Sequence, residues 1–438
     1  MSISLQGAKL VPIFVFKIIW FFVVLLYLFS PYPFHSISIE TWIIILLSFL
    51  VVLIGYYTQY FFDSHRKAEI YSPYRSENIL RIDQKKLELT LTISLFLVSI
   101  GIFGDLFYLS YLISSYGLDP SNIFWYRFFM TSFVAQSTEW DIIHSLLNYL
   151  ILLNNLVVIL SGIYYCFEGK KKVLIYGPIL LALIYSIFTL QRNTLISNLV
   201  YWFGSIFFIS FFLATRKQNL YLKKLLKIIF IFVFFMSLII FLIIIIRFNI
   251  DLGGRFSEKL VELGIQNIYS YLPGNIVALD HYLKSDISFK NGAFFLRDVL
   301  KWISRIGLVE AEMVPLRYME FTNVGSTNMN TYTYIRIFYD DFGVIGLLIM
   351  SYIWGFLGSF IVTQYFKKFR LYRLILVVLI FFSFFISFFT FSLHNLTMIL
   401  LLLLLTRTIE TYLRIEDKSN NENSPLLSKI NDSYEGDY

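Results

Sequence analysis

Apolar stretches long enough to cross a bilayer recur along the whole chain, and polar segments that carry most of the charge separate them. A membrane-spanning helix needs roughly 20 mostly apolar residues. Stretches near that length fall at residues 11–30, 42–62, 88–114, 143–166, 173–190, 195–214, 228–247, 341–364, 374–393 and 395–413. The pattern predicts an all-α polytopic membrane protein with about ten transmembrane helices.

Lysine and arginine are concentrated in alternate loops of this ten-span pattern. Eighteen of them lie in the loops 63–87, 167–172, 215–227 and 366–373, whereas the other short loops hold only Arg127 and Arg192. Because basic loops stay on the cytoplasmic side, the pattern places both termini in the cytoplasm. The same distribution accounts for the net charge of +7, so no nucleic-acid partner is expected.

Composition agrees with a membrane protein. Of the 438 residues, 58% are hydrophobic and 15% are charged, whereas soluble domains carry roughly 25% charged residues. The single cysteine, Cys166, excludes a disulfide framework within the chain. No small-residue cleavage pattern follows the first apolar stretch, which therefore indicates an uncleaved span.

The pattern divides the chain into four regions. Spans one to seven occupy residues 1–247, a large outward loop occupies 248–340, spans eight to ten occupy 341–413, and a polar tail, expected to be disordered, occupies 414–438. A loop as long as the second region is usually functional. Its many aromatic residues fit either a sugar-binding groove or a membrane-interface belt.

One part of the large loop is predicted to be helical. The sequence "FFLRDVLKWISRIG" at 294–307 puts Arg297, Lys301 and Arg305 on one helical face. Such an amphipathic helix either lies on the headgroups or presents a basic wall to a lipid diphosphate.

Arg192 is a candidate phosphate ligand at the outward turn between spans five and six. In "QRNTL", Asn193 and Thr194 are expected to cap the following helix, whose N-terminus adds a partial positive charge. Arginine and helix N-terminus together suit a phosphate. The alternative is an arginine that only snorkels at the interface.

Asp105, within span three, is the chief intramembrane carboxylate, and such a group is a functional candidate by default. An arginine partner is expected, and Arg127 is the outward arginine available; a structural Asp–Arg pair is the alternative. His281 in the large loop and His394 at the last outward turn are candidate bases, or else hydrogen-bonded structural residues.

The stretch "NVGSTNMNTYTYIRIFYDDFGVIG" at 323–346 leads polar groups into span eight, which is expected to begin at Asp341. Asn328, Asn330 and Arg336 are candidate substrate ligands here. The glycines of "DFGVIG" permit close helix approach, although capping and packing alone would explain "DDFG". No zinc, P-loop, dinucleotide-binding or nucleophile-elbow motif is present, so no metal and no cofactor are expected.

The layout resembles the Wzy-type O-antigen polymerases, which join oligosaccharide repeat units. The resemblance rests on about ten spans, a large outward loop late in the chain, "QRNTL" at 191–195 and the polar segment leading into "DFGVIG". It implies glycosyl transfer at the periplasmic face of a bacterial inner membrane, without a metal.

The resemblance also implies substrates and partners. Donor and acceptor would both be undecaprenyl-diphosphate-linked oligosaccharides, with a chain-length regulator and a flippase as protein partners. The departing diphosphate needs cations, for which Arg255, Arg317 and Arg336 join Arg192. His281, His394 or a carboxylate such as Asp105 would deprotonate the acceptor hydroxyl. An O-antigen ligase and a lipid-linked oligosaccharide flippase or transporter remain the alternatives.

Overall fold

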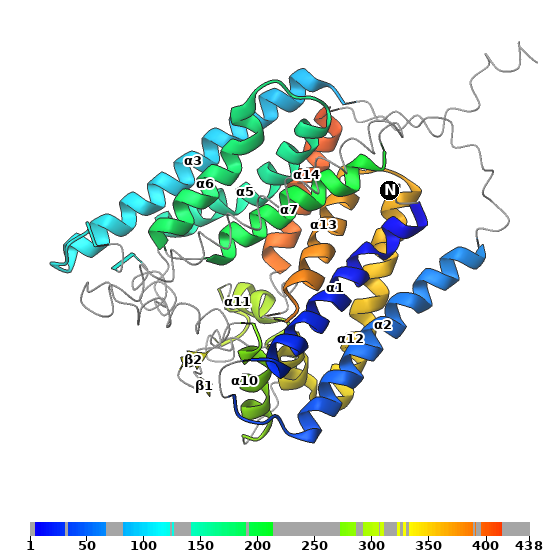
Figure 1. Ribbon diagram of the computed structural model, residues 1–438. Helices are drawn as coiled ribbons and strands as arrows, with labels where there is room; N and C mark the ends of the chain where they lie inside the picture. The colour runs from blue at the N-terminus through cyan, green and yellow to red at the C-terminus, as the bar shows by residue number, and fades with distance from the viewer. Residues whose placement is uncertain are drawn as a thin grey trace, which may run out of the picture.

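The computed structural model describes residues 5–30, 34–66, 82–122, 125–126, 142–189, 192–212, 272–285, 292–305, 307–310, 322–324, 327–329, 333–388, 390 and 396–413. Long helices dominate this part of the chain (Figure 1). They are α1 (Leu5–Leu28), α2 (Ile39–Arg66), α3 (Gln84–Ser115), α5 (Ile142–Cys166), α6 (Lys172–Thr189), α7 (Arg192–Ser210), α12 (Tyr334–Lys367), α13 (Leu371–Ile386) and α14 (Leu396–Leu413).

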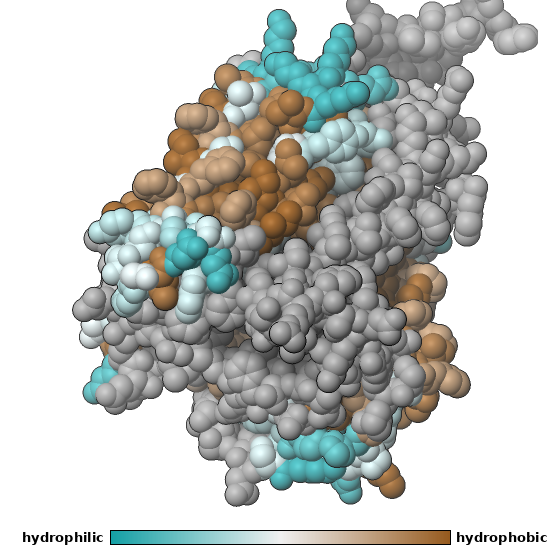
Figure 2. Space-filling model, turned by 60° about the vertical axis from the view of Figure 1, so that its left-hand side comes forward, coloured by the Kyte–Doolittle hydropathy of each residue, from teal (hydrophilic) through white to brown (hydrophobic). Residues whose placement is uncertain are grey.

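Six of the described helices are long and apolar enough to cross a membrane: α1, α2, α3, α5, α6 and α12. The protein is therefore a multi-pass membrane protein. The expected spans 195–214, 374–393 and 395–413 coincide with α7, α13 and α14. The expected span 228–247 and the tail 414–438 lie outside the described residues. Figure 2 shows an apolar surface between polar ends on the described part of one face.

One face of α3 shows why these helices need lipid around them. Its exposed large side chains recur every three or four residues: Leu89, Ile93, Phe96, Ile100, Phe103 and Phe107. That spacing places them on a single helical face, which is too apolar for a surface in water. The opposite face packs against α5 and α6.

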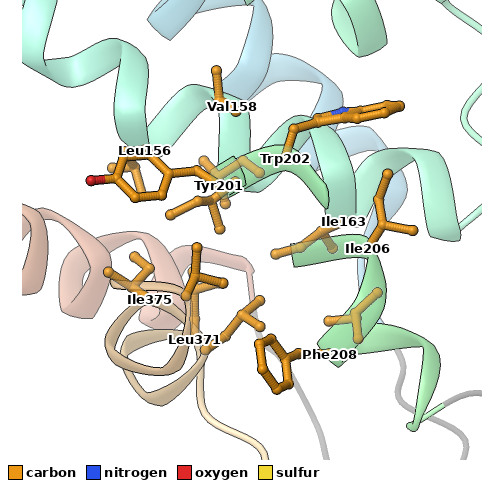
Figure 3. Packing of buried hydrophobic residues seen from close by; sticks show 14 of the residues in the cluster. Leu156, Val158, Ile163, Tyr201, Trp202, Ile206, Phe208, Leu371 and Ile375 are labelled. Carbon is orange, nitrogen blue, oxygen red and sulfur yellow. The ribbon is translucent and has the colours of Figure 1, made fainter. Parts of the chain in front are cut away.

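Two hydrophobic clusters hold the helices together, and α13 belongs to both. Residues of α3, α5, α6, α7 and α14 form one cluster with Leu371 and Ile375 of α13 (Figure 3). Residues of α1, α2, α10 and α12 form the other with Ile380 and Phe384. The helix α13 thus joins the two groups of helices.

The most extensive packing is between α2 and α12. A Cβ atom on Gly55 or on Gly355 would collide with the backbone of the facing helix, so glycine is needed at both positions for this approach. At one end of the same pair, the buried Asp63 lies 3.4 Å from Lys9 and 2.8 Å from Lys367. This carboxylate links α1, α2 and α12.

The large segment that is expected to lie outside the membrane contains four described elements: α10 (Gly274–Leu283), α11 (Arg297–Arg305), and the antiparallel strands β1 (Thr322–Val324) and β2 (Thr327–Met329). The helix expected within 294–307 is confirmed by α11. The helix α12 begins at Tyr334, seven residues before Asp341, where span eight is expected to begin. It breaks at Gly343, with φ 64° and ψ −165°, a backbone region that essentially only glycine occupies.

Candidate functional site

Three helices bring titratable side chains together inside the bundle. Asp105 of α3 is fully buried, and its Oδ1 lies 2.8 Å from Nδ1 of His144 on α5. Tyr185 of α6 donates its hydroxyl to Oδ2 of the same carboxylate over 3.0 Å. On the other side of the imidazole, the Asn148 amide lies 2.6 Å from Nε2. We call Asp105, His144, Asn148 and Tyr185 the carboxylate–imidazole group.

The sequence led us to expect an arginine beside Asp105, and the described partners are an imidazole and a phenol instead. Arg127 itself lies outside the described residues. His144 and Tyr185 were missed because neither stands in a motif. One signal was available for His144: it lies just before the apolar part of α5, Leu146–Cys166, and an ionisable residue at such a place is a functional candidate.

Residues next to the two short-loop arginines, Arg127 and Arg192, are described. The Tyr126 ring, which directly precedes Arg127, lies 6.2 Å from the Phe188 ring of α6. The helix α7 begins at Arg192, and only two residues separate it from the end of α6. The side chain of Arg192 is outside the described part, and Asn193 lies exposed in the first turn rather than preceding the helix as its cap.

A second polar group docks the large segment onto α12. The Asp341 carboxylate accepts the backbone N–H groups of Phe294 and Phe295 over 2.9 and 2.6 Å. These N–H groups belong to the turn that precedes α11. Because Asp341 lies two residues before the break at Gly343, the "DDFG" sequence acts as an anchor for the outward segment.

Arg336, expected to face a substrate, is enclosed at the start of α12. It is only 2% exposed. Its guanidinium lies 3.9 Å from the centre of the Tyr282 ring on α10, and its Nε lies 3.4 Å from the Asp340 carboxylate. The cation therefore stacks on an aromatic face and pairs with an acid one helical turn away.

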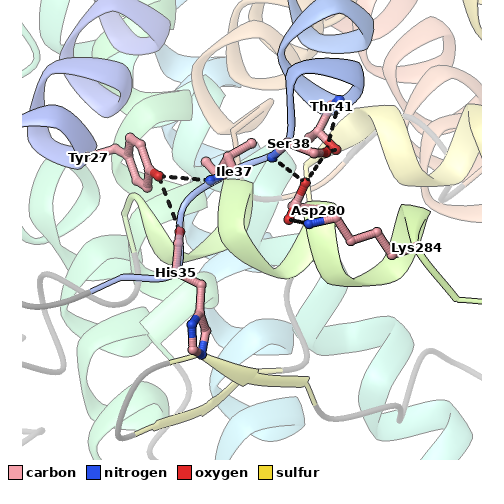
Figure 4. Close-up of polar contacts among 7 residues, drawn as sticks. All are labelled: Tyr27, His35, Ile37, Ser38, Thr41, Asp280 and Lys284. Carbon is pink, nitrogen blue, oxygen red and sulfur yellow. Dashed lines mark hydrogen bonds and ion pairs between the residues drawn. The ribbon is translucent and has the colours of Figure 1, made fainter.

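The helix α10 is tied to the start of α2 through Asp280 (Figure 4). Its carboxylate accepts the backbone N–H and the hydroxyl of Ser38 and pairs with Lys284 at 2.6 Å. Burial by itself would raise the pKa of Asp280, but the hydrogen bonds from Lys284, Ser38 and Thr41 outweigh burial and lower the pKa to about 2. Asp280 is therefore an anionic anchor and not a base.

His281 stands next to this anchor. Its ring lies 5.5 Å from that of His35 in the α1–α2 connection, a neighbour that the sequence did not indicate. Its Nε2 is buried without a hydrogen-bond partner among the described residues. An acceptor atom in that state suits a base, so the structure leaves His281 available for the expected role.

The remaining candidates are not placed by the structure. Arg127, Arg255, Arg317, His394 and Asn330 lie outside the described residues. Asn328 pairs with Asn323 across the hairpin, and its side chain is not described. One chain of contacts leads from the docked segment to the other helices: α11 packs on α14, and α14 packs on α3 and α5.

The chain matches no protein-family model, no curated protein and no solved structure. The argument for function therefore rests on the residues and their geometry.

Proposed function

We propose that this protein polymerises undecaprenyl-diphosphate-linked O-antigen repeat units at the periplasmic face of a bacterial inner membrane. One observation carries the proposal: only two residues separate Arg192, where α7 begins, from the helix whose Tyr185 binds the buried Asp105. A candidate phosphate seat and a carboxylate–imidazole group thus lie on neighbouring helices, α3, α5, α6 and α7.

The proposed reaction is a metal-independent glycosyl transfer. A hydroxyl at the non-reducing end of the acceptor attacks C1 of the donor chain, the C1–O bond breaks, and undecaprenyl diphosphate leaves with the bonding electrons. The diphosphate needs cations, for which we propose Arg192 and Arg127 with Arg255 and Arg317. Arg336 contributes indirectly, because it holds α10 against α12 through Tyr282 and Asp340.

The two lipid-linked substrates must reach the site sideways from the bilayer. The apolar face of α3 from Leu89 to Phe107 supports this route, because undecaprenyl chains are as apolar as the lipid that this face requires. The docked outward segment, anchored by Asp341, supports the binding of the sugar chains above the membrane.

A flippase or transporter is the second candidate, and a specific observation favours it. Besides the carboxylate–imidazole group, the bundle holds a buried amide pair, in which Asn154 of α5 donates to Asn198 of α7 over 3.2 Å. Polar groups inside a helix bundle mark substrate or proton pathways. An O-antigen ligase shares the expected layout of the polymerase and differs in its acceptor.

Deletion of the gene separates these functions by the surface polysaccharide that remains. Single capped repeat units support the polymerase, whereas unattached long polymer identifies a ligase. Cytoplasmic accumulation of repeat units with none at the surface identifies a flippase. Within a polymerase, Arg192→Ala should abolish polymer at an unchanged protein level, and full activity of that variant would remove Arg192 from the site.

A further inference from the structure

The carboxylate–imidazole group has the geometry of an oriented base. The Asn148 amide nitrogen lies 2.6 Å from Nε2 of His144. In the tautomer in which this amide donates, Nε2 carries the lone pair and the proton is on Nδ1, which lies 2.8 Å from Oδ1 of Asp105. A carboxylate that holds an imidazole in this tautomer leaves Nε2 ready to accept a proton.

The position of the group along its helices also suits a substrate that arrives from outside. His144 is the third residue of α5 and lies two residues before the apolar segment Leu146–Cys166. Asp105 is ten residues from the end of α3 and is fully buried. The imidazole and the carboxylate thus lie at different depths along their helices.

A purely structural role accounts less well for these residue types. A buried carboxylate is satisfied most simply by lysine or arginine, and none is paired with Asp105 among the described residues. Instead the carboxylate is shared between an imidazole and a phenol from two different helices. This arrangement fixes the ring and also preserves a proton acceptor.

We propose that His144 accepts the proton of the attacking acceptor hydroxyl and that Asp105 is its positioning residue, with Tyr185 holding the carboxylate. The assignment rests on the proposed polymerase function. The hydroxyl O–H bond breaks, its proton goes to Nε2, and the oxygen forms the new bond to C1. The bonding electrons of the C1–O bond leave with the diphosphate. The acceptor hydroxyl replaces the Asn148 amide as the hydrogen-bond partner of Nε2. The positive charge of the resulting imidazolium is neutralised by the Asp105 carboxylate.

The test uses the full-length protein in detergent with lipid-linked repeat units extracted from a strain that lacks this gene. Polymer formation is followed for wild type, His144→Ala, Asp105→Asn, Asp105→Glu and His281→Ala, with and without added imidazole. Ser161→Ala is the matched control, because this buried α5 side chain bonds only within its own helix, to the Val158 carbonyl. Size-exclusion chromatography checks that each variant is folded.

We expect His144→Ala to lose on the order of 100-fold or more of the rate and to recover part of it with imidazole, which replaces the missing ring. Asp105→Asn should lose activity and Asp105→Glu should retain part of it, while the control stays within twofold of wild type.

A folded His144→Ala variant with a near-normal rate, or one whose rate imidazole does not restore, overturns the assignment to His144. If His281→Ala loses polymer-forming activity and His144→Ala does not, the base is His281 of α10. Wild type that forms no polymer overturns the proposed function together with this assignment.

Discussion

The Asp341 carboxylate of α12 accepts the backbone N–H of Phe295 over 2.6 Å, and that of Phe294 over 2.9 Å. This contact joins two parts of the chain that are 46 residues apart. It explains why an acidic side chain is buried directly before the break at Gly343, since a carboxylate can satisfy two N–H groups at the start of a helical segment.

Asp341→Ala should release the segment from Gly292 to Arg305 without unfolding the helix bundle. Two partly buried N–H groups lose their acceptor, at a cost of up to roughly 1–3 kcal/mol each. Limited proteolysis should then cleave this segment faster than in wild type. Asp119→Asn is the control, because Asp119 also accepts a backbone N–H, that of Ser121, but in an exposed turn. Unchanged protection in Asp341→Ala would show that the anchor is dispensable.

Gly343→Ala should destabilise the protein by about 1–3 kcal/mol, because the φ of 64° and ψ of −165° exclude an L side chain. The variant relieves the strain by continuing the helix, which turns Asp341 away from Phe294. The unfolding temperature and polymer formation should both fall. Gly117→Ala, at φ 71° with open space around it, measures the backbone cost alone; an equal loss in both variants would contradict a special role for the break.

A double variant distinguishes a structural role of Arg336 from a role in substrate binding. Arg336→Met removes the cation from the buried Asp340 and should cost about 3–5 kcal/mol, whereas Arg336→Met with Asp340→Leu should recover most of that stability, since apolar side chains replace a buried pair at little cost. Thermal unfolding measures the recovery. If polymer formation also returns, Arg336 serves only to dock α10; if stability returns alone, the guanidinium contacts the substrate.

The stabilisation that Asp280 provides between α10 and the start of α2 should depend on pH only at acidic pH. The folded-state pKa of Asp280 is about 2, below its ordinary value of 3.8, so the carboxylate stabilises the fold fully above about pH 4. That contribution is lost as the pH falls through about 2. The unfolding temperature of wild type minus that of Asp280→Asn should therefore be constant from pH 5 to 7 and shrink below pH 4. A constant difference down to pH 2 would contradict the depressed pKa.

Some features of the site were visible in the sequence because they depend on neighbouring residues only. The helix around Arg297–Arg305 follows from charges spaced four apart, and the unusual place of Asp105 follows from the apolar residues around it. The anchor role of "DDFG" did not follow, because its partners, Phe294 and Phe295, lie far away in the chain and act through their backbone. The sequence indicated Arg336 as a candidate substrate ligand, but Tyr282, which covers it, carries no signal in the sequence.

The sequence by itself determined that this is a helical, multi-pass membrane protein. Whether a stretch of some 20 residues is apolar enough to enter a bilayer depends on those residues alone. Only the tertiary structure decided which side chains meet. Among the described residues, the partners of Asp105 are His144 and Tyr185, since the partner of a buried group depends on how the helices are rotated and shifted against one another. That packing is set by contacts between distant segments, such as the close approach of α3 to α5 at Gly101, and not by the residues beside Asp105 in the chain.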